Sequence, residues 1–431
     1  MQSEVPARPT TVRHLVVFLT ALSAFILYLH RFYLSFAERF IKDDLQLSDD
    51  QIGWLFSAFF LAYSLGQVPA GWLGDRFGIR KMFTLYIVLW SLFTGLMGVA
   101  FVFGLLVVFR LACGLAQAGA FPVSSGLLSH WVPLADRGKA SAVVSLGGRI
   151  GGFAAPVITA YLVSGLALGW RPIMVIYGIA GLLAAWAFWY GFRDNPREHP
   201  FCNPEEVAII EKGRDRSGKR PGRANSVPLL AMVRSSSLWC SSLTQFGTNI
   251  GWTFLVTWLA RYLKDVHKVP DMERGWMTGL PLLVGIAGMI VGGWATDRMT
   301  RAFGLRWGRA LPMSLSRFIA MAAFLACLLL DSPWPVCVAM ACVAAATDLG
   351  TPALWAFTQD AGGRHVGSVL GWSNMWGNFG ATLSPPLLNW MVKHYGWNGV
   401  FVTCAAGYLI AGLAGLGVNA SKTILPATSQ D

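Results

Sequence analysis

Charged residues are scarce in this sequence: Asp, Glu, Lys and Arg make up 13% of its 431 residues, and only 22 residues are acidic. An ordinary soluble domain carries about twice that share of charge. Apolar residues take its place, because 55% of the chain is hydrophobic and the mean hydropathy is +0.51. The composition therefore excludes an ordinary soluble protein and predicts an integral membrane protein.

The sequence also lacks the signatures of metal, nucleotide or covalent chemistry. No two of its seven cysteines have CxxC spacing, and most of them fall within apolar runs. No Gly-rich nucleotide loop and no constellation of a nucleophile with a base is evident. We therefore expect no metal, no cofactor and no enzymatic activity. The cysteines are Cys113, Cys202, Cys240, Cys327, Cys337, Cys342 and Cys404.

Twelve apolar runs are long enough, at about 20 residues each, to cross a bilayer as helices. The first run is followed by the charged stretch ERFIKDD rather than by a small-residue cleavage site, so we expect it to remain as a span. The predicted fold is an all-α integral membrane protein with twelve transmembrane helices. Their centres lie near residues 24, 62, 91, 116, 150, 180, 248, 285, 320, 346, 378 and 408.

Basic residues predict the orientation of the chain. The formal net charge is +12, and Lys and Arg concentrate in the segments that are cytoplasmic if both termini are. This bias predicts a multi-pass protein of the cytoplasmic (inner) membrane with both termini in the cytoplasm. The lipid bilayer is its expected surrounding, and nucleic acid is not an expected partner. The basic residues at predicted membrane depth are Arg31, Arg110, Arg149 and Arg317.

The longest polar segment, rich in Pro, Gly and Arg, divides the chain into two halves of six spans. We predict an N-terminal six-helix bundle at 1–192, a cytoplasmic linker at 193–235 and a C-terminal six-helix bundle at 236–431. Each half carries a related loop after its second span: GWLGDRFGIRK at 71–81 and GGWATDRMTRAFGLRWGR at 292–309. This repetition indicates that the two halves are internal repeats.

The repeated loop combines glycines, which permit close helix approach, with an acid and several arginines. Such a cluster can latch one helix to another. A positive-inside bias alone would also place basic residues here, but the recurrence in both halves favours a latch. The candidate latch residues are Gly71, Asp75, Arg76, Gly78, Arg80, Asp297 and Arg298.

GWLGDRFGIRK resembles the signature loop of the major facilitator superfamily, and the resemblance covers nearly the whole chain. RLACGLAQAGAFP, HWVPLADRGKASA, FRDNPREHP and GWSNMWGNFGATLSPP resemble the anion:cation symporter group, which holds sugar-acid permeases and vesicular glutamate and sialic acid carriers. The resemblance implies two pseudo-symmetric six-helix bundles, a midplane site between them and alternating access. It also implies a small organic anion substrate and a coupling cation, normally a proton; we expect a monomer.

Tyr28 and Arg31 share one helical face of the first span, and His30 lies about 100° away. The corresponding motif of the group reads Tyr-x-Asp-Arg, in which the Arg binds the substrate carboxylate and the Asp takes part in proton coupling. Here the motif reads YLHR. The resemblance thus implies anion binding by Arg31, while His30 puts the usual coupling in doubt. The alternative is that Arg31 extends to the outer interface.

A second departure lies in span four, where the group often has a Glu and this chain has Gln117. An amide can bind a hydroxyl but cannot carry a proton.

Arg149 lies near the middle of span five, among small residues that leave room around its guanidinium. At that depth we favour a side chain that faces the substrate site over one with a structural role. Together, Arg31 and Arg149 would suit a carboxylate, which a guanidinium binds through two parallel hydrogen bonds.

Asp348, in AAATDLGTPALWAF, is the only carboxyl that we place well inside a span. A carboxyl that is alternately near and far from an arginine or the substrate can load and release a proton. Asp348 and, second, the imidazole of His30 are therefore candidate proton-coupling residues. A permanent structural ion pair, for instance with Arg317, is the alternative.

Amide and aromatic side chains complete the candidate substrate site. Polar faces in spans seven and eleven contain Gln245, Asn249, Asn374 and Asn378, which could simply join helices. The family resemblance favours Asn374 as a substrate contact. The candidate substrate-binding residues are Tyr28, Arg31, Tyr63, Gln117, Arg149, Trp355 and Asn374.

The leading hypothesis is a secondary active transporter of a small organic anion, a sugar acid or another carboxylate, with proton symport. The alternatives are a uniporter or anion exchanger without proton coupling, a transporter-like receptor, and an efflux carrier for hydrophobic cations. The short linker without an apolar core pattern argues against a receptor. Arginines at membrane depth argue against a cationic substrate.

Overall fold

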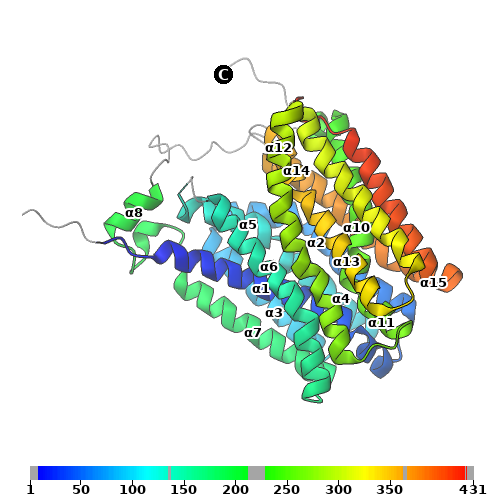
Figure 1. Ribbon diagram of the computed structural model, residues 1–431. Helices are drawn as coiled ribbons and strands as arrows, with labels where there is room; N and C mark the ends of the chain where they lie inside the picture. The colour runs from blue at the N-terminus through cyan, green and yellow to red at the C-terminus, as the bar shows by residue number, and fades with distance from the viewer. Residues whose placement is uncertain (1–7, 134–136, 212–228, 363–365, 423, 425–431) are drawn as a thin grey trace, which may run out of the picture.

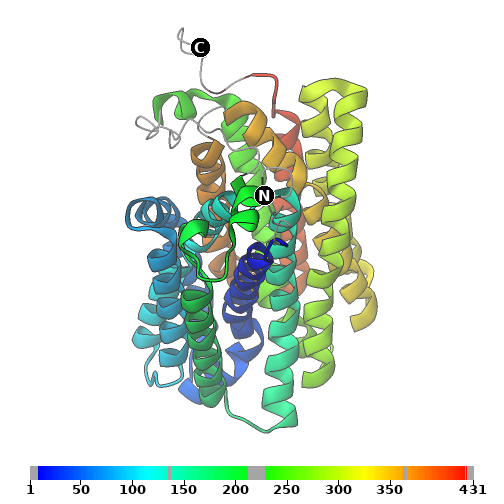
Figure 2. The ribbon, with the colours of Figure 1, turned by 90° about the vertical axis from the view of Figure 1, so that its left-hand side faces the viewer.

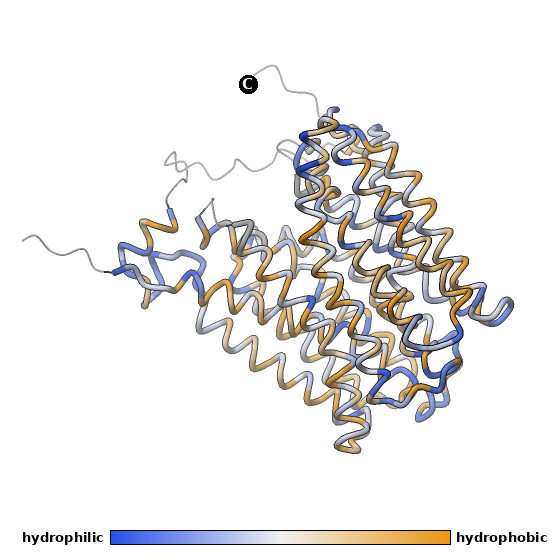
Figure 3. Tube along the Cα trace, in the orientation of Figure 1, coloured by the Kyte–Doolittle hydropathy of each residue, from blue (hydrophilic) through white to orange (hydrophobic). Residues whose placement is uncertain are grey.

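The computed structural model describes residues 8–133, 137–211, 229–362, 366–422 and 424. It leaves undescribed the side chains at 68, 75, 125, 129, 137–139 and 366–368. Within the described ranges all regular structure is helical, and Figures 1 and 2 show two groups of long helices side by side. Figure 3 shows hydrophobic residues along the length of the helices and hydrophilic stretches where helices end.

The first bundle contains six crossings. Its second helix begins with a capping box, in which the Ser48 hydroxyl accepts a hydrogen bond from the Gln51 N–H and the Gln51 side-chain oxygen accepts one from the Ser48 N–H. The helices are α1 (Val12–Leu45), α2 (Asp49–Phe77), α3 (Ile79–Met97), α4 (Phe103–Ala118) with α5 (Ala120–Trp131), α6 (Arg137–Ala160) with a π-helical end (Tyr161–Gly165), and α7 (Trp170–Gly191).

The linker contributes two short helices, and α8 docks on the start of α1 through an ion pair of 2.8 Å between Arg13 and Glu206. In the second bundle, α12 and α15 each hold two crossings, because Gly304 and Gly396 interrupt them at positive φ. The helices are α8 (Pro204–Glu211), α9 (Leu229–Arg234), α10 (Ser236–Thr253), η4 (Phe254–Trp258), α11 (Leu259–Asp265), α12 (Asp271–Ala326), α13 (Pro333–Leu349), α14 (Thr351–Gly362) and α15 (Val366–Leu416).

The described chain crosses the membrane twelve times. Eight helical segments are long and apolar enough to span a bilayer. Two of them, α12 and α15, supply two crossings each, and α2 and the α10–η4–α11 segment supply the other two. The predicted fold class, twelve transmembrane helices in two six-helix bundles, is confirmed.

Matching interruptions relate the two bundles. The fourth crossing is broken at Gly119 (φ −78°, ψ −11°) and the tenth at Gly350 (φ −81°, ψ −12°). The turn after the second crossing of each half is made by a glycine at positive φ, which is 93° at Gly78 and 73° at Gly304. The internal repeat predicted from the sequence is therefore present in the backbone.

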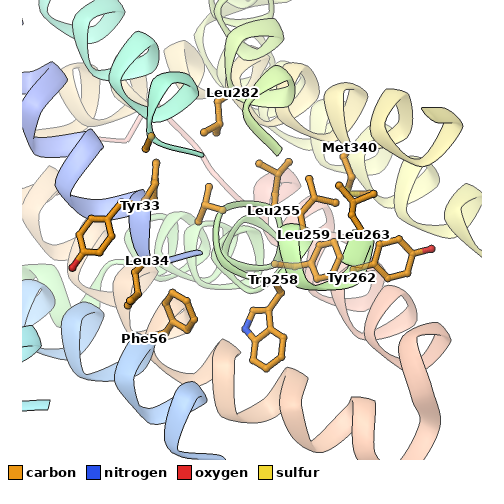
Figure 4. Close-up of a cluster of buried hydrophobic side chains, with 14 of the residues drawn as sticks. Tyr33, Leu34, Phe56, Leu255, Trp258, Leu259, Tyr262, Leu263, Leu282 and Met340 are labelled. Carbon is orange, nitrogen blue, oxygen red and sulfur yellow. The ribbon is translucent and has the colours of Figure 1, made fainter. Parts of the chain in front are cut away.

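A buried apolar cluster joins the bundles at one end, which we name the far end because α1 begins and α15 ends toward the other, the terminal end (Figures 1 and 2). Two further clusters of buried apolar residues are built mainly on one bundle each. Figure 4 shows the joining cluster, in which Tyr33, Leu34 and Phe56 of the first bundle lie near Leu255, Trp258 and Leu259 of the second.

Ion pairs reinforce the contact at the far end. Asp49, the first residue of α2, pairs with Arg261 of α11 at 2.6 Å, and Asp50 pairs with Lys393 of α15 at 2.6 Å. Over residues 71–77, where α2 reaches the terminal end, the described side chains form no ion pair or hydrogen bond with the second bundle. The bundles thus meet at the far end and diverge toward the terminal end, as Figure 1 shows.

Gly78→Ala is expected to lower the melting temperature, because a side chain at φ 93° costs about 1–3 kcal/mol. The added Cβ would also lie 3.0 Å from Asp194 Oδ2. Gly104→Ala is the matched control, since that helical position has no atom within 4 Å of its Cβ and should stay neutral or gain up to about 1 kcal/mol. Thermal unfolding of both variants in detergent makes the comparison; equal melting temperatures would contradict the strained turn.

Candidate functional site

An ion pair between Arg149 and Asp348 joins the two bundles within the membrane. Arg149 lies midway along α6, in the first bundle, and Asp348 lies at the end of α13, in the second. Nη2 of Arg149 contacts Oδ1 of Asp348 directly, and the exposed fractions of the two side chains are 14% and 2%. A charge in a membrane helix costs about 2.5–3.5 kcal/mol on insertion scales, so each group offsets the cost of the other. A candidate substrate residue is thus paired with a candidate coupling residue.

Only one oxygen of Asp348 has a partner. Its Oδ2 is buried and has no hydrogen bond among the described residues. Gly285 of α12 packs against this oxygen so closely that a side chain would collide with it. Arg317, the partner considered from the sequence, donates instead to the Thr347 carbonyl at 2.8 Å. The carboxyl therefore keeps one oxygen at which a proton can bind.

Trp252 of α10 adds a second contact between Arg149 and the second bundle. The Arg149 Cζ lies 5.0 Å from the centroid of the indole ring, at cation–π distance. Sequence reasoning missed Trp252 and Gly285. The signal for Trp252 was its position three residues after Asn249, on the polar face of span seven. Gly285 gave no local signal, because only the fold brings it to Asp348.

Arg31 is held inside the first bundle by Gln117 and by aromatic rings. Its Nε donates to Oε1 of Gln117 at 3.1 Å, and its Cζ lies 4.4 Å from the Tyr63 ring centroid and 5.2 Å from that of Phe59. Its Nη2 is buried and has no hydrogen-bond partner among the residues that the structure describes. A guanidinium with a free buried N–H group is suited to an anion. This packing within the bundle argues against extension to the outer interface.

Tyr28 lies between the Arg31 cluster and the ion pair. A Cβ at Gly148 of α6 would lie 2.9 Å from its ring, so the tyrosine packs directly beside Arg149. Its hydroxyl lies within electrostatic range of Arg31, Arg149 and Asp348. The structure thus brings six candidates together as one cross-bundle site, namely Tyr28, Arg31, Tyr63, Gln117, Arg149 and Asp348.

Gln117 and Asp348 occupy equivalent positions in the two halves. Each lies two residues before the glycine that interrupts its crossing, Gly119 or Gly350. Each is also hydrogen-bonded to an arginine of the first bundle. The repeat therefore carries an amide in its first copy and a carboxyl, which can bind a proton, at the same place in its second copy.

His30 lies apart from the cross-bundle site. Its side chain is fully buried, and its ring stacks on Tyr177 of α7 with the centroids 6.2 Å apart. A Cβ at Gly181 would lie 2.7 Å from the His30 ring. Neither ring nitrogen has a hydrogen-bond partner in the described part of the chain. This placement favours Asp348 over His30 as the coupling residue, which stays a prediction.

Among the described residues, Trp355 and Asn374 make no hydrogen bond, ion pair or ring contact with the residues of the cross-bundle site. Trp355 is 42% exposed on α14, and Asn374 is half-buried on α15. Near Asn374, the amides of Gln245 and Asn249 lie beside Gly377, where a Cβ would be 2.8 Å from Asn249 Nδ2. Nε2 of Gln245 is buried without a partner. Substrate contact by these residues stays a prediction.

The candidate latch of the first half fastens the α2–α3 turn to the end of α7. The backbone N–H of Arg80 donates to Asp194 Oδ1 at 2.8 Å, and its guanidinium donates to the Trp189 carbonyl at 2.7 Å. Gly71 lies on α2 and Gly78 makes the turn itself. These contacts stay within the first bundle. The side chain of Asp75 lies outside the described residues.

The second half repeats part of this arrangement. Arg76 lies over the Trp72 ring at 5.0 Å, and Arg298 lies over the Trp294 ring at 5.6 Å, with the same four-residue spacing. Asp297 is exposed beside Arg298. A latch between bundles involving these residues would need a different arrangement of the bundles, and it stays a prediction.

Known proteins resemble this chain over nearly its full length. The profile of the Major Facilitator Superfamily matches residues 20–385 and 302–427. "Probable galactarate/D-glucarate transporter GudP" of Bacillus subtilis (strain 168) is 30% identical over 427 residues, covering 95% of this chain and 92% of that protein. "Probable sulfoacetate transporter SauU" of Cupriavidus necator is 28% identical over 430 residues, covering 97% and 95%.

A solved structure shares the fold. The bacterial homologue of the human lysosomal transporter Spinster, in an inward-facing and occupied conformation, has a TM-score of 0.73 at 19% identity, covering 95% of this chain and 97% of that one. The family predicted from GWLGDRFGIRK is confirmed by the family profile and by the relative that is 30% identical. Because the family profile spans nearly all of its twelve crossings, the chain belongs to the Major Facilitator Superfamily.

Proposed function

We propose that this protein carries a small organic anion, a sugar acid or another carboxylate, across the inner membrane by alternating access with proton symport. Its family supports a membrane transporter rather than an enzyme. The observation that carries the proposal is the Arg149–Asp348 pair between the bundles. In this pair, the guanidinium of Arg149 can bind a substrate carboxylate and the carboxyl of Asp348 can bind a proton.

The cationic groups of the cross-bundle site support an anionic substrate. Arg31 keeps a buried Nη2 without a partner, and Arg149 binds a carboxylate that a substrate carboxylate can replace. Two relatives carry the names of such substrates, because galactarate, D-glucarate and sulfoacetate are small organic anions. Sugar acids also present hydroxyls, which the amides of Gln117, Gln245 and Asn249 can bind.

We place the terminal end in the cytoplasm, because the positive-inside bias predicts cytoplasmic termini. In this orientation the described arrangement is closed toward the outside by the far-end cluster and diverges toward the cytoplasm. Rocking of the two bundles about the cross-bundle site would close the terminal end and open the far end. The site would then face each side in turn.

An exchange of partners at Arg149 can couple the two movements. When a substrate carboxylate binds Arg149, Asp348 loses its partner and would remain as an unpaired buried charge, at a cost of several kcal/mol. Binding of one proton converts it to a neutral carboxylic acid and removes that cost. When the substrate leaves, Asp348 releases the proton and pairs with Arg149 again. Anion and proton therefore cross together.

Uptake into proteoliposomes tests the proposal. The reconstituted protein is offered labelled D-glucarate, L-galactonate and sulfoacetate, with tetraphenylphosphonium as a cationic control, under an imposed pH gradient, a sodium gradient or none. We expect saturable uptake of at least one carboxylate and accumulation only with the pH gradient. If the substrate reaches equal concentrations on both sides without accumulating, the protein is a uniporter rather than a symporter. If uptake requires substrate inside the liposomes, the protein is an exchanger. Uptake of the cation alone, or binding without uptake, would overturn the proposal.

A further inference from the structure

A cavity of about 150 Å³ lies at the far end, where α1 of the first bundle meets α11 and α12 of the second. Glu38 lines it and is 5% exposed. Its carboxylate makes no hydrogen bond and no ion pair within 4.0 Å among the described residues. An acid this buried and facing a polar cavity, yet without a partner, is unusual, because buried carboxylates are normally paired.

The other charged groups that face this cavity do have partners. Five basic residues and two aspartates line it, and two more aspartates pair with lining residues from outside, so the cluster without Glu38 carries one positive charge in excess. The groups come from four helices, α1, α2, α11 and α12. They are Arg39, Lys42 and Asp43 of α1, Asp49 of α2, Arg261, Lys264 and Asp265 of α11, and Asp271 and Arg274 of α12.

Two influences on Glu38 oppose each other in the closed arrangement. Burial without a hydrogen-bond donor disfavours the carboxylate, whereas the excess positive charge of the neighbouring Arg261 and Arg274 favours it. Both arginines belong to the second bundle and Glu38 belongs to the first. Separation of the bundles at the far end would therefore hydrate Glu38 and remove Arg261 and Arg274 in a single movement, while Arg39 and Lys42 of its own helix stay beside it. Because Glu38 makes no direct ion pair with either arginine, the change in hydration is the larger effect, and the closed arrangement favours the protonated carboxyl.

We propose that Glu38 binds a proton whenever the far end is closed and returns it to the far-side solution when that end opens. The proposal rests on the proposed transport function, of which opening of the far end is a step. Because the closed state holds the additional proton, a lower far-side pH favours closure. The proton comes from the far side and goes back to it. Glu38 therefore changes the pH dependence of transport without adding to the number of protons carried per substrate.

Distance measurements between spin labels test this directly and need no transport. Cysteines replace Phe101 and Leu329, which are 73% and 83% exposed at the far end of the first and second bundle, in a background without the seven native cysteines that retains uptake. The open fraction of the Glu38-containing protein should fall at least about threefold between pH 8 and pH 5, within the tenfold per pH unit that one titrating group allows. In Glu38→Gln the open fraction should stay constant and low.

Glu38→Asp keeps a titratable group and should keep the pH response, which separates titration from a simple packing defect. Uptake assays complete the test: Glu38→Gln should change the dependence of the uptake rate on far-side pH, leaving the part that is due to Asp348, and should keep the ratio of protons to substrate. A Glu38→Gln protein whose open fraction still follows pH would overturn the proposal, as would a changed ratio. Failure of uptake in every variant, with the distance response intact, would instead count against the transport function alone.

Discussion

Arg149→Ala is expected to reduce uptake of the anion by at least about 100-fold, to the level of liposomes without protein. A guanidinium that binds a carboxylate through two charge-assisted hydrogen bonds contributes about 3 kcal/mol or more, which corresponds to about 100-fold in affinity. Arg149→Lys should recover only a part of the uptake, because an ammonium keeps the charge and loses the planar fork. Initial rates in proteoliposomes over a range of substrate concentrations measure the effect.

Loss of folding has to be separated from loss of binding. The alanine variant leaves Asp348 buried without a partner, which alone destabilises by about 3–5 kcal/mol. The double variant Arg149→Ala, Asp348→Asn removes that charge, so it should regain thermal stability and still fail to transport. Arg8→Ala, at an exposed position, is the control for expression and reconstitution. Full uptake by the double variant would contradict the assignment of Arg149 as the anion-binding residue.

Asp348→Asn is expected to abolish accumulation driven by a pH gradient while leaving exchange of substrate across the membrane in place. Asparagine keeps the size and the hydrogen-bonding oxygen of the side chain, but it cannot bind or release a proton in the relevant pH range. Arg149 would then bind the substrate without having to displace a carboxylate. Uptake under a pH gradient and counterflow against internal substrate, measured on the same proteoliposomes, distinguish the two activities.

Because Gln117 and Asp348 occupy equivalent positions in the two repeats, a carboxyl at position 117 is expected to replace part of the function of Asp348. Gln117→Glu restores a carboxyl at the first-half position, 3.1 Å from the Arg31 Nε in the present side-chain geometry. Combined with Asp348→Asn, it should recover a part of the pH-driven accumulation. His30→Gln should leave coupling unchanged, because His30 lies outside the cross-bundle site. Full accumulation by Asp348→Asn alone would show that the proton takes another route.

The number and class of the helices were predictable from the sequence, because hydrophobic length is a local property. Their interruptions were not. Gly119 and Gly350 lie inside apolar runs and break the helix at φ values that any residue can adopt, so nothing in the local pattern marks them. The sequence also does not predict that helices continue on both sides of the turns at Gly304 and Gly396, because this depends on how the neighbouring crossings pack.

The individual residues of the candidate site could be predicted from the sequence, but the contacts between them could not. The expense of a charge in a membrane singles out Arg31, Arg149 and Asp348 in the sequence. That Asp348 contacts Arg149 rather than Arg317 depends on the docking of two bundles, across 199 positions of sequence. Helical periodicity placed His30 on a different face from Arg31, yet only the packing of α7 shows that this face lies inside the bundle.

The ion pair between the bundles also determines how such a carrier responds to the membrane potential. Without substrate, Arg149 and Asp348 carry no net charge together. With a monocarboxylate and a proton bound, Arg149 pairs with the substrate and Asp348 is neutral, so the sum is again zero. Under the proposed proton symport, both forms would then reorient without moving charge at this ion pair, and a monocarboxylate would cross electroneutrally. A dicarboxylate brings one more negative charge, and an inside-negative potential of 100 mV opposes its entry by about 2.3 kcal/mol.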